Sequence, residues 1–314
     1  MRTRNIGTSE LQSSCLAYGC WRIAGSAESN EISFERAEHA KAAVRAAYEA
    51  GFTLFDHADI YSNGFGEELF GQVLKDSHEM RNQVLVASKS GIIKGSKADA
   101  HLPYRYDSSA SHIIQSCEGS LHRLGVDQIH IYMIHRPDFL GHPDEIAQAV
   151  SDLKRQGKIK EFGVSNYTPS QLRLIRKAVD GPIVVNQVEI SLIKLDAFSD
   201  GTLEECMLEN TTPMAWSPLG GGKLTGQESL SLQTADHGHR GKIRDSAEYL
   251  ARHHGVSRSA ILLSWLLMHP SGILPVVGTT NPDHIRQAAA AASLELSREE
   301  WYYLMEAGKG QRLP

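Results

Sequence analysis

Cysteine is scarce in this 314-residue sequence, and its spacing excludes two common uses of the residue. The four cysteines are separated by 5, 97 and 89 residues, which fits neither a Cys-x-x-Cys pair nor a zinc-ribbon spacing. Isolated cysteines without such a pattern are typical of reduced thiols in the cytosol. We therefore expect a cytoplasmic protein in which Cys15, Cys20, Cys117 and Cys206 are free thiols.

Long apolar runs and an excess of positive charge are also missing. The longest apolar run, residues 260–268, is interrupted by Ser264 and is too short to span a bilayer, and the first residues lack the apolar stretch of a signal peptide. The 32 Lys and Arg residues are outnumbered by 37 Asp and Glu residues, so the formal net charge is −5. No overall basic field attracts nucleic acid or an anionic membrane, and we expect neither as a partner.

What the sequence does contain is a regular alternation of two patterns. Short runs rich in β-branched and aromatic residues are followed by longer segments of helical period, and each boundary carries a turn or cap residue. The chain is long enough to bury a sizeable core, and 41% of its residues are hydrophobic. We predict eight strands, at residues 15–19, 53–56, 84–89, 129–134, 161–164, 184–187, 213–216 and 273–277.

Helices are predicted between these strands. In the segment 108–124, apolar residues recur on one helical face, and Gly125 follows in the position that commonly ends a helix. Thr168-Pro169 has the sequence of a cap followed by the first helical residue. The other predicted helices cover residues 35–50, 144–155, 244–254, 257–268, 282–292 and 298–308.

Eight strands alternating with helices fit a closed parallel barrel better than a doubly wound sheet. A doubly wound nucleotide-binding sheet normally carries a Gly-x-Gly-x-x-Gly turn after its first strand, and this sequence has none there. It also shows no internal repeat and no composition typical of a linker. We predict an α/β fold of the (β/α)8 TIM-barrel type, formed as a single domain by residues 1–314.

Polar residues gather where the predicted strands end. In a TIM barrel these carboxyl-terminal ends meet at one face, and the loops that leave them build the functional site. The second strand ends in FDHADIY (55–61), the third in Lys89, the fourth in IHRPD (134–138), the fifth in GVSN (163–166), the sixth in Gln187 and the seventh in AWSPLGGG (215–222).

In this order the motifs resemble the aldo-keto reductase superfamily, in particular a bacterial branch of oxidoreductases, over nearly the whole chain. The resemblance implies a catalytic tetrad of Asp56, Tyr61, Lys89 and His135. Hydride addition to a carbonyl carbon leaves negative charge on the oxygen, and Tyr61 would donate the proton. Lys89, paired with Asp56, would depress the pKa of Tyr61, and His135 would orient the substrate oxygen.

The same resemblance implies a nicotinamide cofactor. Ser165, Asn166 and Gln187 would contact its carboxamide, Trp216 would stack on its ring, and the glycine loop would approach its pyrophosphate. We expect the substrate pocket to contain Trp21, Tyr61, His135 and Arg136. The expected cofactor-binding residues are Gly19, Cys20, Trp21, Ser165, Asn166, Gln187, Trp216, Ser217, Pro218, Leu219, Gly220, Gly222, Gly278, Thr279, Thr280 and His284.

Two segments depart from the family's pattern. Residues 277–286 lack the Lys or Arg with which many members grip the 2′-phosphate, so NADPH is expected as the cofactor and NADH stays open as the alternative. The N-terminus of a helix beginning at Pro282 would still favour a phosphate there. Residues 91–107 form a long insertion that either shapes substrate choice at the rim of the site or is an ordinary surface loop.

We predict an NAD(P)H-dependent oxidoreductase that reduces the aldehyde or ketone group of a small molecule to an alcohol. One alternative is a regulatory barrel that binds the nicotinamide cofactor without significant turnover. The other is a metal-dependent barrel hydrolase, suggested by 15 histidines. The first strand carries no His-x-His pair, and His237 and His239 are expected in a polar loop, so we predict no metal site.

Overall fold

The computed structural model describes residues 1–25, 33–95, 99, 101–226 and 237–314. Eight parallel strands form a closed barrel, in which each strand pairs with its neighbours in the order β3-β4-β5-β8-β9-β10-β11-β12, and β12 pairs with β3 to close it. The predicted (β/α)8 TIM barrel is therefore confirmed. The strands are β3 (Ala17–Gly19), β4 (Leu54–Asp56), β5 (Leu85–Ser90), β8 (Ile129–Ile134), β9 (Ile159–Ser165), β10 (Ile183–Glu189), β11 (Thr212–Trp216) and β12 (Leu274–Val277).

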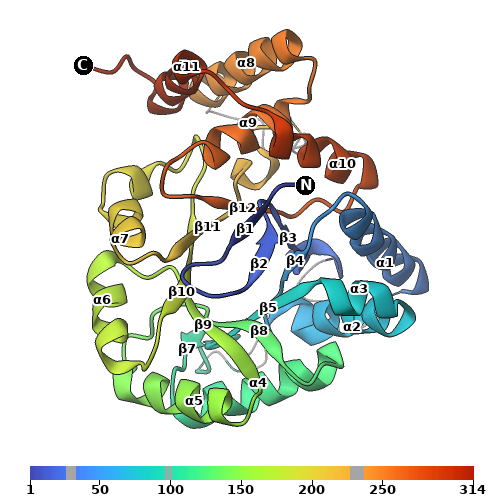
Figure 1. The fold of residues 1–314 in the computed structure, drawn as a ribbon, viewed down its shortest axis with the longest axis vertical. Helices are drawn as coiled ribbons and strands as arrows, with labels where there is room; N and C mark the ends of the chain where they lie inside the picture. The colour runs from blue at the N-terminus through green and yellow to red at the C-terminus, as the bar shows by residue number, and fades with distance from the viewer. Residues whose placement is uncertain (26–32, 96–98, 100, 227–236) are drawn as a thin grey trace.

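Helices surround the barrel, and capping residues set many of their ends (Figure 1). Helix α4 begins after Ser109, whose hydroxyl accepts a hydrogen bond from the backbone of His112, and ends at Gly125 with φ +64°. Thr168 and Gln171 form a reciprocal capping box at α6. The helices are α1 (Phe34–Glu49), α2 (Phe65–Asp76), α3 (His78–Gln83), α4 (Ala110–Leu124), α5 (Pro143–Arg155), α6 (Pro169–Ala178), α7 (Thr202–Leu208), α8 (His237–His254), α9 (Arg258–Leu267), α10 (Pro282–Ala289) and α11 (Arg298–Lys309).

A hairpin that the sequence did not predict lies across the barrel near its centre (Figure 1). Strand β1 (Thr3–Asn5) pairs antiparallel with β2 (Gln12–Ser14). Between them, Ile6 and Leu11 are buried in one cluster with barrel residues such as Leu54. The hairpin therefore covers apolar side chains of the barrel interior with apolar side chains of its own.

The insertion at residues 91–107 contains a second hairpin. Strand β6 (Ile92–Ile93) pairs antiparallel with β7 (Arg105–Tyr106), directly after the end of β5. The two paired strands therefore lie next to the carboxyl-terminal end of β5.

Helix α8 corrects one prediction. It begins at His237 rather than at residue 244, so His237 and His239 belong to a helix and not to a polar loop. Gly238 and Gly241 weaken the helical pattern there, but apolar residues further along α8, such as Ile243 and Leu250, are buried in a cluster with residues of α9 and α11. Within the described residues, no three His, Cys, Asp or Glu side chains are grouped as metal ligands. None of the described helices is long and apolar enough to cross a membrane.

Candidate active site

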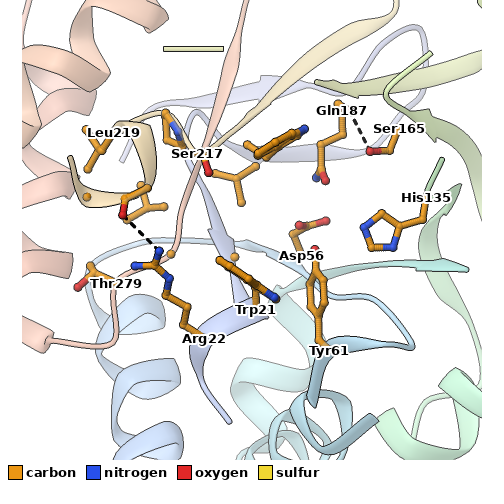
Figure 2. Close-up of a pocket in the computed structure, with 18 of the residues that line it drawn as sticks. Trp21, Arg22, Asp56, Tyr61, His135, Ser165, Gln187, Ser217, Leu219 and Thr279 are labelled. Atoms are coloured by element: carbon orange, nitrogen blue, oxygen red, sulfur yellow. Dashed lines mark hydrogen bonds between the residues drawn. The ribbon is translucent and has the colours of Figure 1, made fainter. Parts of the chain in front are cut away.

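A cavity of about 800 Å³ opens at the carboxyl-terminal ends of the barrel strands. It is large enough to bury an extended ligand. Figure 2 shows Tyr61, Asp56 and His135 toward one end of it, with Thr279 and Leu219 toward the other. The predicted residues that line it are Gly19, Trp21, Asp56, Tyr61, His135, Arg136, Ser165, Asn166, Gln187, Trp216, Ser217, Pro218, Leu219, Gly222, Gly278, Thr279, Thr280 and His284.

Three predicted residues lie behind the cavity wall. Cys20 is fully buried, and burial raises the pKa of its thiol well above the usual value. Gly220 is buried next to Ile193, and Gly221 lines the cavity in its place. Lys89 is completely buried and does not line the cavity itself, but it contacts Asp56, which does.

A buried ion pair forms the floor of the cavity. The Lys89 ammonium donates hydrogen bonds to Asp56 Oδ1 at 2.7 Å and to the His57 carbonyl oxygen at 2.6 Å. The Lys89 and Asp56 side chains are 0% and 4% exposed, so water screens their interaction little. Lys89 Nζ lies 5.1 Å from the centre of the Tyr61 ring. A fixed positive charge is thus held next to the tyrosine.

The net pKa of Tyr61 differs from the sequence-based expectation. Burial raises it to about 12, and this outweighs the lowering by the positive charge of Lys89. The prediction of a depressed pKa was wrong in net sign, although the contribution of Lys89 has the expected direction. Tyr61 therefore carries its proton throughout the neutral pH range, which a proton donor requires.

His135 stands beside Tyr61 at the end of β8. The two rings lie 5.8 Å apart between centres and are nearly perpendicular, at 77°. Burial lowers the pKa of His135 well below its usual value, and the charges of Lys89 and Arg136 act in the same direction. His135 is therefore a neutral imidazole that offers one N–H donor. Its Nδ1 is buried and has no hydrogen-bond partner among the described residues.

The backbone after Tyr61 adopts an unusual conformation. Ser62, Asn63 and Gly64 have φ values of +48°, +55° and +92°, and such positions persist only where their surroundings hold them. Arg123 provides part of this support, since a Cβ atom on Gly64 would lie 2.7 Å from Arg123 Cδ. The left-handed turn thus fixes where Tyr61 enters the site.

Arg123 is held in turn by a buried carboxylate that the sequence analysis missed. Glu67 of α2 accepts hydrogen bonds from Arg123 Nε at 2.8 Å and from Ser88 Oγ at 2.5 Å. Ser88 directly precedes Lys89, so Glu67 connects the strand that carries Lys89 with the turn that carries Tyr61. The sequence signal is a carboxylate on the same helical face as Phe70 and Leu74, which are both buried.

A hydrogen-bonded cluster occupies the cavity wall formed by β9, β10 and β11. Ser165 Oγ donates to the Gln187 carbonyl oxygen at 2.9 Å, as Figure 2 shows. Asn166 donates to Ser165 Oγ at 2.8 Å and accepts from Trp216 Nε1 at 3.0 Å. Gln187 Nε2 is buried without a partner among the described residues. Since buried donors are rarely left unpaired, this amide fits the carboxamide oxygen of a nicotinamide.

The opposite part of the cavity provides mainly backbone groups, together with the side chain of Arg22. Gly221 and Gly222 have φ values of +68° and +98°, and a Cβ atom on either would meet nothing within 4 Å, so a ligand can approach their backbone closely. The Tyr18 hydroxyl donates to the Thr279 carbonyl oxygen at 2.9 Å and fixes the loop before α10. The cavity-lining residues between 276 and 284 include His284 but no Lys or Arg. Arg286 instead pairs with Asp283 at 2.6 Å.

Several cavity residues were not predicted. Arg22 follows the predicted Trp21 and donates to the Gly221 carbonyl oxygen at 3.3 Å, across the cavity (Figure 2). Tyr104 and Tyr106 come from the insertion and show that its hairpin forms part of the wall. The alternation of tyrosine and arginine in Tyr104-Arg105-Tyr106 is the sequence signal that places both tyrosines on the same face of a strand. The lining residues that were not predicted are Arg22, Ile60, Ile92, Tyr104, Tyr106, Gly221, Thr225, Val276, Val277 and Asn281.

Comparison with known proteins gives similarity over almost the whole chain. A protein-family model described as "Aldo/keto reductase family" matches residues 15–309. The chain is 38% identical to a protein of Novosphingobium aromaticivorans named 6-dehydroglucose reductase, covering 99% of this chain and 97% of that protein. A protein of the same name from Agrobacterium fabrum is 34% identical, with 96% of each chain covered.

Solved structures agree with these sequence matches. The structure of the glycerol dehydrogenase AKR11B4 from Gluconobacter oxydans superposes with a TM-score of 0.85 at 25% identity. The match covers 97% of this chain and 94% of that one. The similarity therefore extends over almost the whole chain, including the barrel.

Proposed function

This chain belongs to the aldo/keto reductase family of oxidoreductases, and on that premise we propose that it reduces an aldehyde or ketone to an alcohol with NADPH. One observation carries the proposal: a buried Lys89–Asp56 pair lies beneath Tyr61, which is protonated and faces the cavity beside a neutral His135. This arrangement suits a reaction that develops negative charge on an oxygen and then protonates it.

Each residue of the catalytic group has a different role in this reaction. When bound, the reduced nicotinamide supplies the hydride. Tyr61 donates its phenolic proton to the substrate oxygen, and Lys89 stabilises the tyrosinate that remains. His135 donates a hydrogen bond that positions the same oxygen. Asp56 keeps the Lys89 ammonium in place and offsets its buried charge.

Other residues would hold the cofactor. Ser165, Asn166 and Gln187 would bind the carboxamide, and Trp216 would contact the ring. The loop 217–222 would offer backbone N–H groups to the pyrophosphate. The first turn of α10, beginning at Pro282, would favour the 2′-phosphate of NADPH through the helix dipole, because the Asn281 side chain already accepts hydrogen bonds from the backbone N–H groups of Asp283 and His284. NADH is the alternative cofactor, because none of the cavity-lining residues between 276 and 284 is a Lys or Arg.

Titration of the unliganded protein with each nucleotide, followed by tryptophan fluorescence, tests the cofactor assignment. We expect saturable quenching by both, with NADPH bound about two- to fivefold more tightly, because a helix terminus contributes only about 0.3–1 kcal/mol to binding an anion. A Trp216→Phe variant should lose most of the quenching. A Trp301→Phe variant should retain it, since Trp301 stacks on Trp265 and does not line the cavity. Absence of saturable quenching by either nucleotide would contradict the assignment.

Turnover separates the proposed reductase from a regulatory barrel. The substrate panel should include aliphatic, aromatic and sugar-derived aldehydes, the last because two relatives are named 6-dehydroglucose reductase. Tight nucleotide binding without oxidation of NADPH by any member of the panel would favour the regulatory alternative.

A further inference from the structure

One cationic side chain in the cavity wall has no role in the reaction described above. Arg136 follows His135 at the end of β8, is half-buried and lines the cavity. Its guanidinium lies 5.7 Å from the centre of the Trp216 ring, within the range of a cation–π contact. Among the described residues, no carboxylate forms an ion pair with it.

The charge of Arg136 is not balanced by other groups of the wall. Asp56 is the only acidic side chain among the described residues that line the cavity, and it is paired with Lys89. His135 is neutral and adds no negative charge. A partly desolvated cation without a counterion is unfavourable, and such groups are normally paired. Arg22, the other arginine of the lining, donates to the Gly221 carbonyl oxygen in the glycine loop, so Arg136 is the guanidinium available for an anion in the part of the wall that follows β8.

The position of Arg136 separates it from the cofactor phosphates. The glycine loop suited to the pyrophosphate follows β11, and the helix N-terminus suited to the 2′-phosphate follows β12. Arg136 follows β8, and two barrel strands, β9 and β10, lie between β8 and β11. Burial raises the pKa of Tyr104 in the insertion, and the positive charge of Arg136 acts in the opposite direction. Tyr104 also lines the cavity. Arg136 thus belongs to the part of the cavity formed by β8 and the β6–β7 hairpin.

The geometry of the side chain adds specificity to its charge. A guanidinium is planar and can bind a carboxylate or phosphate through two parallel N–H donors. The contact with the Trp216 indole restricts the orientation of the Arg136 guanidinium before a ligand binds. Less side-chain entropy is therefore lost when an anion binds to it. His135 and Arg136 line the same cavity, so one small molecule can contact both side chains.

We propose that Arg136 binds a carboxylate or phosphate group of the carbonyl substrate, and that the enzyme therefore prefers anionic aldehydes or ketones over neutral ones of the same shape. This inference rests on the proposed reductase function and specifies its substrate class.

Matched substrate pairs test the preference. 4-Carboxybenzaldehyde is compared with methyl 4-formylbenzoate, and glyceraldehyde 3-phosphate with glyceraldehyde, each at saturating NADPH. We expect the wild type to show a kcat/KM at least tenfold higher for the anionic member of one pair, and the preferred pair distinguishes carboxylate from phosphate. Arg136→Met should reduce this anionic-to-neutral ratio about 10–100-fold, the loss expected for hydrogen bonds to a charged group. Arg136→Lys should retain part of it, because the charge remains without the two-donor geometry.

A matched control distinguishes local binding from a general change in charge. Arg105 lies on β7, is exposed and does not line the cavity, so Arg105→Met removes the same charge nearby and should leave the ratio unchanged. If Arg136→Met also leaves the ratio unchanged, or if the wild type prefers the neutral members, the inference is wrong while carbonyl reduction stands.

A binding measurement covers the case of no turnover. Calorimetric titration with 4-(hydroxymethyl)benzoate, a product-like carboxylate, should give at least tenfold weaker binding to Arg136→Met than to the wild type. Failure of all four aldehydes to oxidise NADPH, together with Arg136-dependent carboxylate binding, would overturn the reductase function and retain the anion site. Equal binding by both proteins would overturn the anion site.

Discussion

Replacing Tyr61 with phenylalanine is expected to lower kcat for carbonyl reduction about 10²–10⁴-fold, the range typical of a lost general acid. The substitution removes the hydroxyl of a ring whose centre lies 5.1 Å from the Lys89 ammonium and 5.8 Å from the centre of the His135 ring. The aromatic ring stays, so the cavity should keep its shape and its affinity for NADPH. Steady-state kinetics and the tryptophan titration measure these two effects separately.

A remote tyrosine supplies the control for this substitution. Tyr303 lies on α11, is 45% exposed and does not line the cavity. Tyr303→Phe should therefore change kcat less than twofold. Equal rates for the wild type and Tyr61→Phe would show that another group donates the proton, and the assignment of the four catalytic residues would be wrong.

Replacing Lys89 with methionine should have two large effects. The first is on stability, because the Asp56 carboxylate is left buried without its partner, and losing one member of a buried pair costs about 3–5 kcal/mol in the free energy of unfolding. The second is on activity, because the tyrosinate formed from Tyr61 loses the adjacent positive charge. Denaturant unfolding and steady-state kinetics measure them independently.

The pH dependence gives the direction of the second effect. The pKa of Tyr61 is about 12 in the folded protein, and Lys89 lowers it, so Lys89→Met moves this pKa further upward. In the reverse reaction, alcohol oxidation, Tyr61 must accept a proton, and the rate rises as pH approaches its pKa. The variant should therefore need a higher pH for the same oxidation rate.

The double variant Lys89→Met/Asp56→Asn separates stability from chemistry. It removes the unpaired charge, so it should recover most of the lost stability while remaining as inactive as the single variant. Recovery of activity in the double variant would contradict the role proposed for Lys89.

Much of the fold follows from local patterns in the sequence. The alternation of β-rich and helical segments predicted all eight barrel strands, and glycine or capping residues marked many helix ends. The polar motifs at strand ends predicted most of the cavity wall, because parallel strands in a closed barrel bring those ends together. Asp56, Lys89 and His135 lie far apart in sequence and meet only for this reason.

The features that were missed depend on contacts between distant segments. Strands β1 and β2 have three residues each, and their role becomes visible only when Ile6 and Leu11 are buried against the barrel. The β6–β7 hairpin has two residues per strand, too few for a periodic pattern. The net pKa of Tyr61 depends on how deeply the folded protein buries the ring, and no neighbouring residue type reveals this.

The most direct test of the proposed reaction follows a deuterium label. The wild type is incubated with an aldehyde of the panel and with NADPH that carries deuterium at both C4 positions of the reduced nicotinamide ring, and the alcohol is analysed by mass spectrometry. The proposed reaction predicts one deuterium on the carbinol carbon of the product and a much slower appearance of that product with Tyr61→Phe. Nucleotide binding without deuterated alcohol, or an alcohol without the label, would contradict hydride transfer in this cavity.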